Sequence, residues 1–145
     1  MSYHTWIDYG YGICVSYIEV DSVEKLEKLL SLAPKFHSDI QDYFKESQIT
    51  EPTVDDYIEY DDSYFLGLAS LLKEVIHEAE GIELYACDDY DGDNYLIYPP
   101  IYPWQMTEKY KSMTEESLNE LFLKYVSILT DEPVDIGYQS VENGG

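Results

Sequence analysis

The chain has 145 residues, of which 45% are hydrophobic and 15% aromatic, so we expect one folded domain over residues 1–145. It carries 30 acidic residues against eight basic ones, and its formal net charge is −22. All eight basic residues are lysines, whereas nucleic-acid-binding domains are basic and commonly grip phosphate with arginine. The composition therefore argues against direct nucleic-acid binding.

The N-terminal segment is expected to be extended. Residues Tyr3 to Val20 are rich in β-branched and aromatic side chains, which favour a strand. Gly10 and Gly12 interrupt this run and predict a bulge or a break into two strands. Asp21 or Ser22 can then cap a first helix, because short polar side chains accept hydrogen bonds from the first helical turn.

Three further helices are expected in the middle of the chain. Pro34 ends the first helix and can begin the second, and Thr53 caps a short third helix through Tyr60. A longer helix from about Ser63 to Ala79 has a wide apolar face, which predicts that it is the most buried one. Gly81 can end it in a left-handed conformation.

The C-terminal part is expected to supply paired strands and a last helix. The segments Ile82 to Cys87 and Tyr95 to Tyr98 flank an Asp91-Gly92 turn, which is typical of a hairpin. The proline-rich residues Pro99 to Trp104 predict an ordered loop, Thr114 caps a final helix, and Val134 to Val141 can form a strand. Because strands and helices do not alternate regularly, we expect an α+β fold, a small antiparallel sheet with about four to five helices.

The acidic residues are most concentrated from Glu46 to Asp93, where Lys73 is the only lysine. Tyrosines lie among these acids, and the chain has 16 tyrosines against four phenylalanines. Tyrosine offers a rigid ring and a hydroxyl, which suits an interface. We therefore predict a partner-binding surface made of Glu51, Asp55, Asp56, Tyr57, Glu59, Tyr60, Asp61, Asp62, Asp88, Asp89, Tyr90, Asp91 and Asp93.

Motifs for catalysis or cofactor binding are not evident, so we expect a protein that is not an enzyme and uses no cofactor. The three histidines and two cysteines lack zinc-site spacing, and Gly10-Tyr11-Gly12 lacks the third glycine of a dinucleotide site. The oxygen-rich turn from Asp88 to Asp93 suits a hard cation, but its spacing departs from an EF-hand. Calcium binding at this turn is kept as an alternative.

Two segments resemble known sequences: the stretch from Tyr3 to Cys14, which contains Tyr9-Gly10-Tyr11-Gly12, and the ending Tyr138 to Gly145. They resemble a group of small uncharacterised proteins from Gram-positive bacteria and their phages and mobile elements. In size and charge, though not in any motif, the chain is similar to phage-encoded anti-CRISPR and anti-restriction DNA mimics.

These observations favour a cytoplasmic, non-enzymatic inhibitor that occupies the basic nucleic-acid-binding surface of a partner protein, such as a nuclease. An immunity or antitoxin protein that neutralises a cationic toxin would need the same charge, and the sequence does not separate the two. We expect neither a direct nucleic-acid partner nor a membrane partner. The chain begins without a basic and then apolar run, which predicts the absence of a secretion signal.

Overall fold

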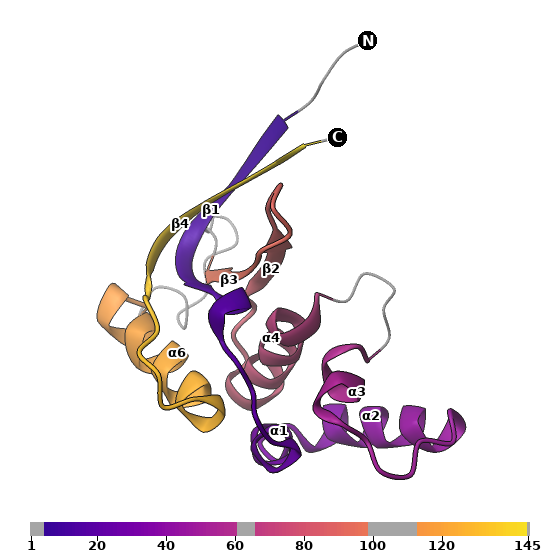
Figure 1. Ribbon diagram of the computed structural model, residues 1–145. Helices are drawn as coiled ribbons and strands as arrows, with labels where there is room; N and C mark the ends of the chain where they lie inside the picture. Colours follow the sequence, from indigo (N-terminus) through magenta and orange to yellow (C-terminus); the bar gives the residue numbers. More distant parts are fainter. Residues whose placement is uncertain (1–4, 61–65, 99–112, 145) are drawn as a thin grey trace.

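The computed structural model describes residues 5–60, 66–98 and 113–144, which form the expected α+β fold around an antiparallel sheet (Figure 1). The strands are β1 (Thr5–Cys14), β2 (Tyr85–Asp88), β3 (Asn94–Tyr98) and β4 (Gly137–Gly144). The helices of the described ranges are α1 (Val23–Leu30), α2 (Pro34–Glu46), α3 (Val54–Ile58), α4 (Gly67–Glu80) and α6 (Glu115–Leu129).

The sheet has the strand order β2-β3-β1-β4. β1 pairs with β4 from Thr5–Gly144 to Gly12–Gly137, but it pairs with β3 only from Tyr11–Tyr98 to Cys14–Tyr95. The first six residues of β1 and the last six of β4 therefore continue beyond the β3 pairing as two strands. We call this part the β1–β4 ribbon, and Figure 1 shows it extending toward the chain termini.

β1 is one continuous strand through both glycines, so the expected bulge or break is wrong. A Cβ at Gly12 would clash with the carbonyl oxygen of Leu96 and would lie 2.8 Å from the Cα of Ile97. A Cβ at Gly10 would lie 2.5 Å from the carbonyl oxygen of Tyr98. The glycines are needed because the backbones of β1 and β3 approach each other closely here.

Several expected boundaries also shift. β1 ends at Cys14, and Val15–Tyr17 form one turn of 3-10 helix instead of continuing the strand. The last strand is Gly137–Gly144, three residues later than expected. α4 begins at Gly67, after its N-cap Leu66, and not at about Ser63 as expected; Ser63 itself and the expected loop from Pro99 to Trp104 lie outside the described residues.

The main core lies between the helices and one face of the sheet. α4 is the most buried helix, as expected, and it contacts α2, β2 and β3. α6 lies against β1 and α1. A second, smaller cluster on the other face of the sheet joins Cys87, Ile97 and Val141 with the half-buried Tyr95.

Three of the five described α-helices begin at a side-chain cap, whereas α2 and α4 do not. The side chains of Ser22, Thr53 and Thr114 accept backbone hydrogen bonds at the starts of α1, α3 and α6. Ala33, which precedes α2, has no side chain that can do so. The carboxylate of Glu78 on α4 replaces this cap by accepting from the backbone N–H groups of Lys35 and Phe36, at 3.0 and 2.9 Å.

Within the described ranges, the structure contains no helix with the length and apolar character needed to cross a membrane.

Candidate functional site

The acids around α3 divide into one structural residue and three exposed ones. Asp56 accepts hydrogen bonds from the backbone N–H and the hydroxyl of Thr53, at 2.8 and 3.1 Å, and Thr53 Oγ1 accepts from the Asp56 N–H in return. This capping box holds the start of the helix. Glu51, Asp55 and Glu59 are exposed and present their charge to solvent.

Tyr57 is a core residue, so its assignment to the partner-binding surface is wrong. Its side chain is 3% exposed and meets the ring of Phe44 edge to face, with the centroids 4.9 Å apart. Burial raises the pKa of the Tyr57 hydroxyl, and the neighbouring carboxylate of Glu27 raises it further. The ring of Tyr57 therefore stabilises the packing of α3 on α2 and is not available to a partner.

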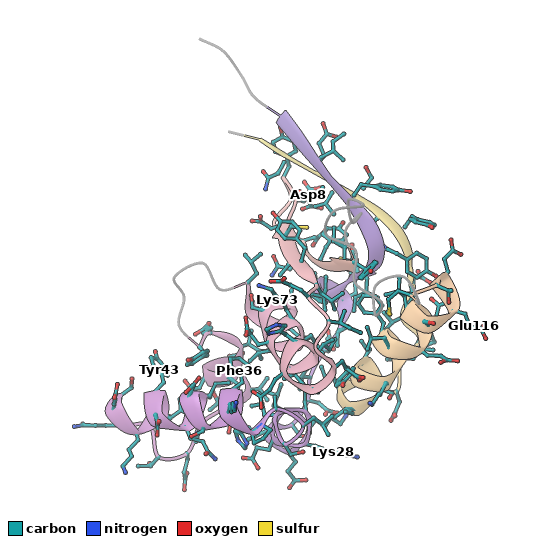
Figure 2. The ribbon with its side chains drawn as sticks, turned by 180° about the vertical axis from the view of Figure 1, so that it is seen from behind. Asp8, Lys28, Phe36, Tyr43, Lys73 and Glu116 are labelled. Carbon is teal, nitrogen blue, oxygen red and sulfur yellow. The ribbon has the colours of Figure 1, made fainter. Side chains whose placement is uncertain are left out.

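Tyr60 follows α3 and is half-buried. Its ring meets Tyr43 and Phe36 edge to face, with centroids 5.1 and 6.1 Å away. Figure 2 shows both of these partners on α2. Asp61 and Asp62 lie outside the described residues.

In the turn between β2 and β3, Asp89 has a structural role. Its Oδ1 accepts from the backbone N–H groups of Asp91 and Asp93, at 2.9 and 3.0 Å, and its Oδ2 accepts from the Tyr95 hydroxyl at 3.2 Å. Gly92 has φ +83°, the left-handed conformation that the turn requires. Asp88 and Asp91 are exposed, whereas Asp93 is half-buried.

The same turn is attached to the end of β4. The backbone N–H of Tyr90 donates to the carbonyl oxygen of Glu142 at 3.1 Å. The side-chain amide of Asn143 donates to the carbonyl oxygen of Asp88 at 2.9 Å and to its Oδ1 at 3.3 Å. The acidic turn and the β1–β4 ribbon are therefore connected parts of one end of the molecule, and Tyr90 is exposed there.

Within the described residues, the elements that carry the two halves of the expected surface approach each other near the start of α4. A Cβ at Gly67 would lie 3.4 Å from Ile58, the last residue of α3, and 4.0 Å from the side-chain nitrogen of Asn94, the first residue of β3. In Figure 1, however, α3 lies beside α2, while the turn between β2 and β3 lies toward the termini. The exposed acids of α3 and of the turn therefore do not form one compact patch.

The structure also shows an acidic pocket that the sequence interpretation missed. A cavity of about 840 Å³ lies between the end of β1, the segment before α1 and the segment after α6. Lys25 lines it and pairs with Asp21 at 2.8 Å. The other charged lining residues are Glu19, Asp131, Glu132 and Asp135. The two lining segments are far apart in sequence, so no local pattern could indicate the pocket.

The calcium alternative gains no support from the described ranges. They contain no group of three or more histidine, cysteine, aspartate or glutamate side chains placed to hold a metal ion. In the turn itself, the Asp89 carboxylate faces three donors of its own chain.

No protein-family model, no curated protein and no solved structure matches this chain.

Proposed function

We propose that this protein is a non-enzymatic inhibitor of the DNA-mimic type, which occupies a basic nucleic-acid-binding surface of a partner protein such as a nuclease. The observation that carries the proposal is the charge: 30 carboxylates, eight lysines and no arginine. Such an excess destabilises a compact fold by self-repulsion, and solubility alone requires far less of it.

The exposed acids support this role because, within the residues that the structure describes, the five named next form no ion pair. Glu51, Asp55 and Glu59 lie on or beside α3, Asp88 is the last residue of β2, and Asp91 lies in the turn that follows; all five are exposed. Double-stranded DNA presents about one negative charge per 1.7 Å of its axis, and a basic groove recognises that field. A folded surface of carboxylates offers a similar field and would be steered rapidly toward the groove.

The first experiment identifies the partner and tests competition. Tagged protein is used to capture partners from a host lysate, and each captured protein is then assayed by gel shift with its own nucleic acid. We expect increasing amounts of this protein to displace the nucleic acid. A partner that binds nucleic acid normally while saturated with this protein would refute the DNA-mimic role.

A charge-reversal pair tests whether the α3 acids contribute. The test variant is Glu51→Lys, Asp55→Lys and Glu59→Lys, which leaves the structural Asp56 intact. The control is Glu24→Lys, Glu120→Lys and Glu132→Lys, which reverses three exposed acids elsewhere. We expect the test variant to associate with the partner about tenfold more slowly than the control at low salt, and the difference to shrink as salt rises. Equal rates for both variants would show that net charge alone matters.

A further inference from the structure

The β1–β4 ribbon presents an aromatic and aliphatic face that the helices leave uncovered. Side chains alternate along a strand, so Ile7, Tyr9, Tyr11 and Ile13 share one face of β1. Ile13 and Tyr11 are buried, and the Tyr11 hydroxyl donates to Asn119 Oδ1 on α6 at 2.7 Å. Ile7 and Tyr9 lie farther along the ribbon and are 61% and 50% exposed.

Tyr138 on β4 completes this face. It lies opposite Tyr11 in the register and is 58% exposed. Its ring stacks on Tyr9 with the centroids 5.7 Å apart and the planes 6° from parallel, and it meets Tyr11 edge to face at 5.0 Å. The Tyr138 hydroxyl donates to Glu115 Oε1 at 2.7 Å. The rings are therefore already held in place, so ordering them on binding would cost little entropy.

Carboxylates border this face at both ends. Glu115 lies beside Tyr138, and the exposed Glu142 lies opposite Ile7 in the register. The turn between β2 and β3 is hydrogen-bonded to β4 at Glu142 and Asn143, which places its acids at the same end of the molecule. Figure 2 shows that this end, marked by Asp8, lies far from α2, marked by Tyr43.

The combination of tyrosine faces and carboxylates fits arginine better than other occupants. A second copy of this chain would also carry a net charge of −22, so electrostatic repulsion opposes self-association through this face. A guanidinium group can stack on a tyrosine ring while its edge donates to a carboxylate, whereas the compact ammonium group of lysine stacks less well.

We infer that the ribbon face of Ile7, Tyr9 and Tyr138, bordered by Glu115 and Glu142, binds an arginine-bearing basic surface of a partner protein. The inference rests on the proposed function in that it takes the partner to be basic. It adds a second contact surface, remote from α3, and the residue type that this surface selects.

The experiment compares nona-arginine and nona-lysine peptides, which carry equal charge, by fluorescence anisotropy at 0.15 M salt. We expect the unmodified protein to prefer the arginine peptide by roughly two- to fivefold, the range expected for exposed cation–π contacts. The variant Ile7→Ser with Tyr9→Ser should lose this preference. The control Tyr17→Ser with Leu123→Ser removes two other exposed apolar side chains, 80% and 51% exposed, and should keep it.

A titration of the unmodified protein gives a result that does not depend on how the variants fold. With the arginine peptide, the NMR signals of the Ile7 methyl groups and the Tyr9 ring should shift saturably, while those of the Leu123 methyl groups stay in place. Unmoved Ile7 and Tyr9 signals, or loss of the arginine preference in the control variant, would overturn the assignment of this face. Either result would leave the proposed function standing, because that function fails only in the competition gel shift.

Discussion

The cap that α4 provides for α2 gives the sharpest stability prediction. Glu78→Ala removes the acceptor for the backbone N–H groups of Lys35 and Phe36, which Ala33 cannot replace. Loss of an N-cap typically costs about 1 kcal/mol, within a range of about 0.5–2 kcal/mol. Because two donors lose a charged acceptor, we expect a loss of about 1–2 kcal/mol, which for a domain of this size lowers Tm by roughly 2–8 °C.

The matched control is Glu74→Ala, one helical turn earlier on α4. Glu74 is also half-buried, and within the described ranges it makes no hydrogen bond or ion pair. Both variants remove one negative charge from a chain of net charge −22, so relief of self-repulsion is similar in the two. Glu78 also lies near the C-terminus of α4, where a carboxylate opposes the helix dipole, so the change in dipole interaction cannot explain a loss of stability in Glu78→Ala.

Urea unfolding followed by circular dichroism measures both variants. We expect Glu78→Ala to be less stable than Glu74→Ala, with Glu78→Gln in between because its amide keeps one acceptor oxygen. If Glu78→Ala and Glu74→Ala have the same free energy of unfolding, the Glu78 carboxylate does not stabilise α2 as its cap.

Two further predictions concern the sheet. Gly12→Ala should abolish folding or cost several kcal/mol, because its Cβ would clash with the carbonyl oxygen of Leu96. The control Gly137→Ala, on the opposite strand, places a Cβ that meets no atom within 4 Å and should leave Tm nearly unchanged. Equal Tm values for the two variants in thermal melts would contradict the close approach of β1 and β3. Cys87 should react with iodoacetamide more slowly at pH 8 than the half-buried Cys14, because burial, followed by the charges of Asp8, Asp88 and Asp89, raises the pKa of the Cys87 thiol to about 12. Peptide mapping that finds Cys87 alkylated before Cys14 would contradict this order of reactivity. The unfolded thiol ionises near pH 9.0 and the folded one does not, so the free energy of unfolding should fall as pH rises from about 9 to 12. Cys87→Ala should weaken this pH dependence.

The sequence alone predicted the structural features that depend only on residues close together in the chain. The caps at Ser22, Thr53 and Thr114 and the left-handed Gly81 involve contacts within one helical turn. Thr53, Thr114 and Gly81 lie where they were predicted, and Ser22 is one of the two caps expected for the first helix. The hairpin around Asp91-Gly92 is local in the same sense. The α+β fold class could be predicted as well, because it depends on the order of these locally determined helices and strands.

Features that depend on distant residues could not be predicted. Tyr57 follows two aspartates and has the sequence context of an exposed residue, yet Phe44 of α2 covers it. The role of Glu78 depends on α2, more than 40 residues earlier in the chain. The apolar residues after Cys14 continue a strand pattern, but the backbone turns there into a 3-10 helix. Each of these features involves contacts between segments that are distant in the sequence, which no local pattern encodes.

The distinction between structural and exposed carboxylates changes how the charge should be interpreted. Asp56 and Glu78 cap helices, and Asp89 organises the turn between β2 and β3. Glu80 accepts hydrogen bonds from Lys124 and Tyr125, at 3.2 and 2.9 Å. These four side chains already have donors within the fold, so a partner would have to displace those donors before it could bind them. The field available to a basic partner therefore comes from the exposed acids, and mutations that test binding should be confined to them, because substitution of a structural carboxylate would lower stability and binding together.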